Sequence, residues 1–253
     1  MTKILLSGCN GKMGRVIAQT ILKMKDCAVV AGIDPNTEIN DGFHVFPTPF
    51  DCGDTEADVI IDFSHPAALK PLLQYAEGRK LPIVVATTGL SQLQIQCIYE
   101  AAKKIPVFFS ANMSMGVNLM VELCKTATRV LGSEFDIEII EKHHNQKIDA
   151  PSGTAIVLAD AIRGELGKST NYVYERQSVR EKRNPDEIGI LSMRGGTIAG
   201  EHEVYFAGRD EILTISHSAR SKEIFANGAL NAAMFLLGKA IGLYSMSELI
   251  QRD

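Results

Sequence analysis

The sequence predicts an α/β protein with a doubly wound, Rossmann-type parallel sheet, into which a smaller α+β domain is inserted. Three observations predict this fold. Short apolar runs alternate with helix-length amphipathic segments from Lys3 to Phe109. A glycine-rich turn follows the first apolar run and opens a helix. After Asn184 the pattern changes to extended segments separated by glycines, which is typical of a mixed or antiparallel sheet.

The first part of the chain contains the alternating elements. Strands are expected at 3–7, 28–33, 57–64, 82–89 and 107–109, and helices at 15–22, 66–78 and 91–103. Alternation of this kind gives a parallel sheet covered on both faces, with ligands beyond the carboxyl ends of the strands. We therefore expect residues that follow these strands to line a binding crevice, although a capping role is equally consistent with His65 and Thr87.

The second part contains a different order of elements. Helices are expected at 116–131 and 154–167, with a half-buried strand at 135–141 between them. Extended segments at 188–193, 202–206 and 211–217 follow, and a long amphipathic helix at 222–242 returns to the first domain. We place the first domain at 1–114 and 224–253 and the inserted domain at 115–223.

Composition excludes several classes of protein. The net charge of −4 gives no electrostatic footprint for nucleic acid. No apolar run approaches the roughly 18 residues that span a membrane, and the N-terminus lacks the apolar region of a signal peptide. The five cysteines form no CxxC pair and no His/Cys cluster, so we expect reduced thiols, no metal site and a cytoplasmic location.

The glycine turn predicts a dinucleotide site. Gly8, Gly11 and Gly14 are spaced GxxGxxG between the first strand and its helix, where glycines permit a tight turn and a close pyrophosphate approach. A second strand ends at Asp34, 20 residues after Gly14, where a carboxylate accepts hydrogen bonds from ribose hydroxyls. This context favours a nicotinamide or flavin dinucleotide over a purely structural glycine turn.

A polar stretch from Glu141 to Thr154 carries acid–base chemistry. His143, His144 and Lys147 can donate or hold protons near neutral pH. Pro151 and Ser152 are good residues for starting a helix, and the backbone N–H groups that follow can bind a carboxylate. On composition alone, a polar strand-to-helix loop with solvated histidines is an equally good interpretation.

Five segments carry a family resemblance. They read GCNGKMG at 8–14, TTG at 87–89, SANMS at 110–114, EKHHNQKIDAPSGT at 141–154, and RGG at 194–196 leading to GEH at 200–202. With these segments the chain resembles, over essentially its full length, the bacterial dihydrodipicolinate reductases, also called 4-hydroxy-tetrahydrodipicolinate reductases. The segment at 143–154 is highly specific, whereas a GxxGxxG turn by itself is not.

The resemblance implies hydride transfer from NADH or NADPH to a small cyclic dicarboxylate, giving tetrahydrodipicolinate in the diaminopimelate route to lysine. It implies that His143 and Lys147 are the catalytic acid–base pair, and that His144, Gly153 and Thr154 bind the substrate. It further implies cofactor contacts from Gly8, Cys9, Asn10, Gly11, Lys12, Met13, Asp34, Ala86, Thr87, Thr88, Ser110, Ala111, Asn112 and Met113. The first domain is then dinucleotide-binding, and the inserted domain binds substrate and assembles a homotetramer through its sheet.

Two positions depart from the family pattern. Members that favour NADPH often have an arginine after the ribose acid, whereas Pro35 follows Asp34 here. A carboxylate without that arginine repels the 2′-phosphate, so we predict a preference for NADH, which Lys12 could offset. Lys222 stands where the family has an arginine, and the role of that arginine is therefore in doubt in this chain.

Two alternative functions are compatible with the sequence. The first is another nicotinamide-dependent dehydrogenase that acts on an amino-acid precursor. The second is a non-catalytic dinucleotide-sensing module. Against the second, the chain has no basic helix-turn-helix segment, and the cluster of His143 and Lys147 would have no task.

Overall fold

The chain divides into two compact units. The structure, a computed structural model, describes residues 1–38 and 42–251. Unit 1 comprises Met1–Met115 and Lys222–Asp253, and unit 2 comprises Gly116–Ser221. The sequence placed the second boundary at 224, and residues 39–41, 252 and 253 of the expected first domain lie outside the described residues.

Unit 1 is built on a seven-stranded sheet in which every described pairing is parallel. The order is β12-β6-β5-β4-β1-β2-β3, so the direction of chain progression reverses between β1 and β4. In open α/β sheets the ligand crevice lies at this reversal, beyond the carboxyl ends of the strands. The strands are β1 (Thr2–Ser7), β2 (Cys27–Ile33), β3 (His44–Phe46), β4 (Val59–Asp62), β5 (Ile83–Val85), β6 (Pro106–Phe109) and β12 (Gly242–Tyr244).

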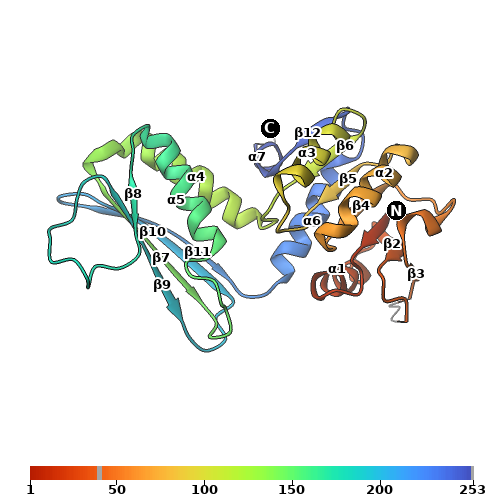
Figure 1. Cartoon of the computed structure of the whole chain (residues 1–253), viewed down its shortest axis with the longest axis horizontal. Helices are drawn as coiled ribbons and strands as arrows, with labels where there is room; N and C mark the ends of the chain where they lie inside the picture. Colours follow the sequence, from red (N-terminus) through yellow and green to blue (C-terminus); the bar gives the residue numbers. More distant parts are fainter. Residues whose placement is uncertain (39–41, 252–253) are drawn as a thin grey trace. The chain divides into compact units, whose positions relative to one another are not determined.

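Helices cover both faces of this sheet (Figure 1). One face is covered by α1 (Lys12–Leu22), α6 (Glu223–Leu236) and α7 (Met246–Ile250), and the other by α2 (Leu69–Arg79) and α3 (Gln92–Ala101). Alternate residues of β1 point to opposite faces: Ile4 and Leu6 pack against the first set of helices, and Leu5 packs against the second. Because both faces of the sheet are buried, the strand sequences are continuous apolar runs. The predicted Rossmann-type fold is confirmed.

Unit 2 contains a mixed five-stranded sheet in the order β11-β10-β7-β9-β8. The central strand β7 (Asp136–His143) is parallel to β9 (Glu187–Arg194) and antiparallel to β10 (Gly200–Ala207). The outer strands are β8 (Asn171–Val173) and β11 (Ile212–Ala219). Helices α4 (Met115–Leu131) and α5 (Gly153–Leu166) cover one face, where Ile137 and Ile139 of β7 are buried against them (Figure 1).

Several elements differ from the sequence-based expectation. The helix expected at 222–242 ends at Leu236, because Gly238 adopts a left-handed φ of +75° and the chain then forms β12 beside β6. Helix α7 follows, with a capping box between Ser245 and Glu248. Strand β8 lies between residues 167 and 188, where the sequence analysis places no helix or strand, and short 3₁₀ helices occur at η1 (Pro49–Cys52), η2 (Pro66–Ala68) and η3 (Gly132–Glu134).

Residues 1–38 and 42–251 contain no helix with both the length and the apolar character that crossing a bilayer demands.

Candidate active site

The glycine loop of unit 1 leaves no room for side chains. Gly8 has a φ of +75°, and a Cβ there would lie 2.6 Å from the carbonyl oxygen of Phe63. A Cβ on Gly14 would lie 2.1 Å from the carbonyl oxygen of Gly8. Gly11 is the N-cap of α1 and supplies no capping side chain, so the N–H groups of the first turn have no helical partner. The loop therefore presents backbone donors to an external anion.

Asp34 lies beside this loop at the end of β2. One of its carboxylate oxygens accepts from the backbone N–H of Asn10 at 3.1 Å, and the other accepts from the N–H of Asn36 at 3.0 Å. These bonds hold the carboxylate at the edge of the glycine loop. Acceptance of hydrogen bonds from ribose hydroxyls by Asp34 stays a prediction.

Two cavities of unit 1 share Phe63 and Ser64 in their linings. The larger, about 660 Å³, includes Gly8, Gly11 and Asp34 and is otherwise rich in proline and aromatic carbon. The smaller, about 400 Å³, includes six residues that the sequence assigned to the cofactor: Met13, Ala86, Thr87, Thr88, Ala111 and Met113. Sequence reasoning missed Phe63 and Phe225 as lining residues. Lys222, the position that departs from the family arginine, lines the smaller cavity.

Five residues assigned to the cofactor do not line either cavity: Cys9, Asn10, Lys12, Ser110 and Asn112. Cys9 is buried against β2, where a Cβ on Gly32 would meet its sulfur at 2.5 Å. The Ser110 hydroxyl donates to the carbonyl oxygen of Asn112 at 2.8 Å and shapes the turn after β6. The side chains of Cys9 and Ser110 therefore support the walls of the crevice.

A buried carboxyl group also supports the crevice wall. Asp62 ends β4 and is fully buried, and this burial raises its pKa. It accepts from the Thr87 hydroxyl at 2.7 Å and from the Ser64 N–H at 3.1 Å. Thr87 therefore lines the smaller cavity and also stabilises its wall through the hydrogen bond of its hydroxyl group to Asp62.

In unit 2 the end of β7 presents two ionisable side chains on the helix-facing side. Glu141 and His143 are two residues apart, so the strand alternation directs both toward α5. Glu141 is 0% exposed and binds Arg194 through two hydrogen bonds of 2.7 and 2.8 Å. The backbone N–H of Ser152 donates to the same carboxylate at 3.0 Å. Arg194 is adjacent because β9 pairs with β7 in a register that sets it opposite His143.

The pair of Glu141 and His143 defines which ring nitrogen is available. Nδ1 of His143 lies 2.6 Å from the Glu141 carboxylate. Burial by itself raises the pKa of Glu141, but hydrogen bonds from Arg194, Ser192 and His143 outweigh it and lower the pKa to about 2. An ionised carboxylate only accepts, so Nδ1 carries a proton, and Nε2 is the ring nitrogen that does not face the carboxylate. A Cβ on Gly200 would lie 3.0 Å from Nε2, so a glycine leaves this nitrogen uncrowded.

A second buried histidine completes the cluster. The ring of His202 lies 5.2 Å from that of His143, and its Nε2 lies 2.9 Å from the Ser152 hydroxyl. Burial, and next the proximity of His143, lower the pKa of His202 to about 4. His202 is therefore neutral near pH 7 and accepts from Ser152, whose oxygen also accepts from the Ala155 N–H at 3.2 Å. Ser152 is the N-cap of α5, which confirms the capping role expected from the sequence.

The loop between β7 and α5 holds Lys147. Its ammonium group lies 2.8 Å from the Asp149 carboxylate, and this hydrogen bond lowers the pKa of Asp149. The loop is anchored to the turn after β9, because Asn145 donates to the Gly196 carbonyl at 3.2 Å and Arg194 donates to the Asp149 carbonyl at 2.6 Å. Lys147 and His143 thus lie on one braced strand-to-helix connection.

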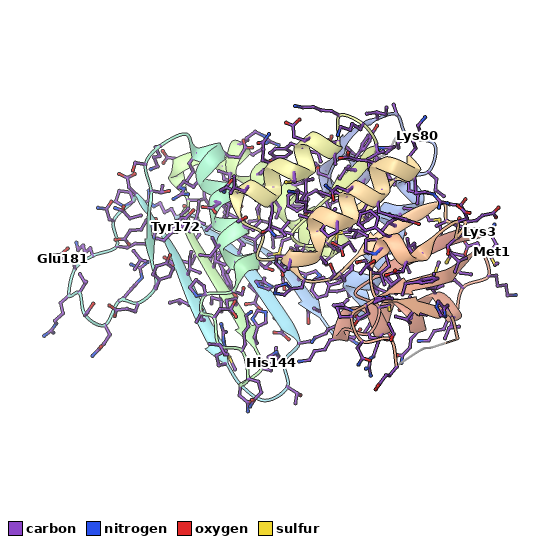
Figure 2. The ribbon with its side chains drawn as sticks, turned by 45° about the vertical axis from the view of Figure 1, so that its right-hand side comes forward. Met1, Lys3, Lys80, His144, Tyr172 and Glu181 are labelled. Carbon is purple, nitrogen blue, oxygen red and sulfur yellow. The ribbon has the colours of Figure 1, made fainter. Side chains whose placement is uncertain are left out.

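The three residues expected to bind substrate lie on the same connection. His144 directly follows β7, and its Nδ1 is buried without a hydrogen-bond partner among residues 1–38 and 42–251. Figure 2 shows His144 at one end of the strands of unit 2, away from the loop that carries Glu181. Gly153 and Thr154 form the first turn of α5, and no atom lies within 4 Å of a Cβ built on Gly153. The space beside Gly153 at the start of α5 is therefore uncrowded.

Sequence reasoning missed three members of this cluster: Glu141 as the partner of His143, Arg194 as the partner of Glu141, and the buried His202. The signal for Glu141 was present, since residues i and i+2 of a strand share a face. Arg194 and His202 come from other strands, and only strand pairing brings them to β7. No group of three potential ligands in the described part of the chain has the geometry of a metal site.

Family models and similar sequences of known proteins carry the same name, dihydrodipicolinate reductase or 4-hydroxy-tetrahydrodipicolinate reductase. The family model described as dihydrodipicolinate reductase, N-terminus, matches residues 2–113, and the one described as dihydrodipicolinate reductase, C-terminus, matches residues 116–250. The chain is 51% identical to the 4-hydroxy-tetrahydrodipicolinate reductase of Caldanaerobacter subterraneus, covering 100% of this chain and 99% of the relative. It is 48% identical to the enzyme of that name from Clostridium tetani, covering 97% and 96%.

A solved structure is similar in fold. The dipicolinate-bound dihydrodipicolinate reductase from Paenisporosarcina sp. TG-14 superimposes with a TM-score of 0.81 at 24% identity and covers 97% of each chain. The sequence matches extend across both units, and the arrangement of elements is shared with this solved enzyme. On these grounds, the chain belongs to the dihydrodipicolinate reductase family.

Proposed function

We propose that this chain catalyses the NADH- or NADPH-dependent reduction of 4-hydroxy-tetrahydrodipicolinate to tetrahydrodipicolinate in the diaminopimelate pathway of lysine biosynthesis. One observation carries the proposal. A chain that is 51% identical over its whole length to a relative of that name places His143, paired with a buried carboxylate, and Lys147 on a single loop before an open helix start. That loop combines proton donors with an anion site.

The residues of unit 1 fit a nicotinamide dinucleotide. The crowded positions of Gly8 and Gly14 and the uncapped start of α1 suit a pyrophosphate. We assign the adenosine half to the larger cavity beside Asp34 and the nicotinamide half to the smaller cavity beside Thr88. When bound, the dinucleotide supplies the hydride for the reduction.

The residues of unit 2 bind the substrate and move protons. We assign the two substrate carboxylates to the N–H groups of Gly153 and Thr154 and to His144, because a helix start and an imidazole both complement negative charge. Loss of the 4-hydroxyl group as water gives an unsaturated ring, and hydride addition to that ring leaves electron density that a proton must neutralise. Lys147 donates that proton, and Nε2 of His143 exchanges protons with the substrate.

We propose that NADH is the preferred cofactor. Asp34 is held by Asn10 and Asn36 at the ribose position, and Pro35 stands where a phosphate-binding arginine would be needed. A fixed carboxylate repels the 2′-phosphate of NADPH. Comparing kcat/KM for the two cofactors tests the preference, and a clear advantage for NADPH would contradict it.

We further propose a cytoplasmic homotetramer that assembles through the sheet of unit 2. The face of this sheet opposite to α4 and α5 exposes Leu191, Met193 and Ile212 to 40%, 49% and 65%. Apolar side chains exposed on one face of a sheet support burial of that face in an assembly. All five cysteines are free thiols, which suits the cytoplasm. Light scattering on the purified protein measures the number of subunits.

A coupled assay tests the proposed activity. Pyruvate, aspartate semialdehyde and the synthase that condenses them generate the substrate, and NADH consumption is then followed after addition of the protein. We expect consumption that depends on all three components. Consumption only with another amino-acid precursor would support a different dehydrogenase, and NADH binding without turnover would support a sensing module.

A further inference from the structure

The carboxylate of Glu141 has every position around it occupied by a donor. Arg194 donates to both oxygens; Oε1 also accepts from the Ser152 N–H at 3.0 Å, and Oε2 lies 2.6 Å from Nδ1 of His143. Its side chain is fully buried and bears a full charge that the guanidinium balances. A buried ion pair of this kind is expensive to desolvate and contributes little net stability. Its presence beneath a proton-transfer residue therefore calls for another explanation.

The contact with His143 fixes both the tautomer and the orientation of the ring. With Nδ1–H directed at Glu141, the ring cannot rotate without breaking a short, charge-assisted hydrogen bond. Nε2 has no hydrogen-bond partner among residues 1–38 and 42–251, and Gly200 leaves the space beside it uncrowded. The nitrogen that exchanges protons is therefore held on the opposite side of the ring from its anchor.

Arg194 also reaches the loop that holds the second proton donor. Besides its bonds to Glu141, its guanidinium donates to the Asp149 carbonyl at 2.6 Å, and the Asp149 carboxylate binds Lys147 at 2.8 Å. The next residue, Gly195, donates its N–H to the His143 carbonyl at 2.9 Å. One side chain thus connects the strand of His143 with the loop of Lys147.

We propose that Glu141 and Arg194 are a positioning pair for proton transfer, in which Glu141 fixes the tautomer and ring of His143 and Arg194 holds Glu141 against the Lys147 loop. This role rests on the proposed reductase function. During turnover Glu141 stays ionised and takes no proton; the proton moves on and off Nε2, and the carboxylate stabilises the imidazolium when it forms. The titratable groups next to this ring are Glu141 and His202. Arg194 is bound to Glu141, and His217 and Lys147 are close enough to His202 to lower its pKa.

Glu141→Gln tests the pair most directly. The amide keeps the size of the side chain, but it removes the charge and its NH₂ group can donate to Nδ1, so the other tautomer becomes favoured. We expect kcat to fall by roughly 10²-fold or more with KM changed by less than about threefold, as for a tautomer defect. We also expect the acid limb of the profile of kcat/KM against pH to move. Nitrogen-15 NMR of the full-length protein reads the His143 tautomer independently of activity.

Arg194→Lys is the second variant, and Glu165→Gln is the matched control. Lysine keeps the positive charge but loses the two-pronged donor, so we expect kcat to fall by about tenfold with partial loss of the Nδ1–H tautomer. Glu165 is also paired with an arginine, Arg129, in unit 2 at 3.0 Å, but it makes no contact with His143. Glu165→Gln should leave kcat, the pH profile and the tautomer unchanged.

The outcomes separate this role from the reductase function. If Glu141→Gln and Arg194→Lys lower Tm and activity while the His143 tautomer and the pH profile stay as in the natural protein, the pair is only structural and the positioning role is wrong. If the natural protein shows no turnover in the coupled assay, the proposed function fails. Tautomer loss in Glu141→Gln then still supports positioning, because that measurement needs no substrate.

Discussion

Two strand–loop–helix connections of this protein can be compared, one in each unit: β1 to α1, and β7 to α5. Both end in a helix start that can bind an anion. In unit 1 the N-cap is Gly11, which supplies no side chain, and the neighbouring backbone leaves no room for a side chain at Gly8 and Gly14. In unit 2 the N-cap is the buried Ser152, and the loop is built from ion pairs and histidines.

The difference lies in where the anion comes from. In unit 1, Asp34 accepts from the N–H of Asn10 in the loop, but the first turn of α1 contains no acidic residue, so the N–H donors of that turn are left for an external phosphate. Unit 2 places its own carboxylate, Glu141, on the N–H of Ser152, which is the N-cap of α5. Substitutions that add a side chain at a glycine should therefore disturb the connection from β1 to α1. Changes of charge or pH should disturb the connection from β7 to α5.

The largest effect is expected from Lys147→Ala, which tests the side-chain chemistry of unit 2. Loss of the proton donor should lower kcat by roughly 10³-fold, the range for general acid catalysis, while the dissociation constant of NADH stays unchanged because unit 1 is intact. Steady-state kinetics and a fluorescence titration with NADH measure the two quantities. Lys168→Ala is the control, since Lys168 is also an ion-paired lysine of unit 2. Near-normal turnover of Lys147→Ala would refute the assigned role.

Gly14→Ala tests the backbone chemistry of unit 1. Its Cβ would lie 2.1 Å from the Gly8 carbonyl and 2.6 Å from Cys9, so backbone atoms must shift. We expect the free energy of unfolding to fall by roughly 1–3 kcal/mol, the usual cost of overpacking, together with weaker NADH binding. In contrast, Gly153→Ala in α5 meets no atom within 4 Å and should keep its Tm. Equal Tm values for Gly14→Ala and the natural protein would contradict the comparison.

His202 tests the pH sensitivity of unit 2. Its pKa of about 4 lies below the ordinary value of 6.5, so between these values the unfolded chain binds a proton that the folded chain does not. Stability is therefore complete above pH 6.5 and decreases by up to about 3 kcal/mol as the pH falls to about 4. Tm measured against pH should be flatter for His202→Gln over this window, whereas His44→Gln, at an exposed position, should follow the natural protein. Parallel curves for His202→Gln would disprove the assignment.

The smallest effect is expected at Asp34, the charged side chain beside the glycine loop. Asp34→Asn removes the repulsion toward a 2′-phosphate but keeps an acceptor for the ribose. We expect the ratio of kcat/KM for NADPH to that for NADH to rise by about tenfold, equivalent to about 1.4 kcal/mol. Asp58→Asn, which alters a carboxylate bound to the Lys3 N–H, is the control. An unchanged ratio would mean that Asp34 does not select the cofactor.

The sequence by itself determined the fold class and the two helix starts. Alternating apolar runs predict the parallel sheet because local periodicity reports which faces are buried. The glycines around Gly11 and the residues from His143 to Thr154 could be recognised because each set is contiguous in the chain. The contact between Glu141 and His143 could also be predicted, because residues two apart on a strand point to the same face, but the sequence analysis did not include it.

Only the tertiary structure decided which distant residues join these segments. Arg194 is 53 residues from Glu141, and His202 reaches Ser152 from 50 residues away. Their placement depends on the register of β9 and β10 against β7, which long-range pairing sets and no local pattern reports. The same reason applies to β12, because its place beside β6 depends on strand pairing. Local sequence determines the helices, the strands and the contiguous motifs. Strand pairing determines which distant side chains, such as Arg194 and His202, lie against a motif.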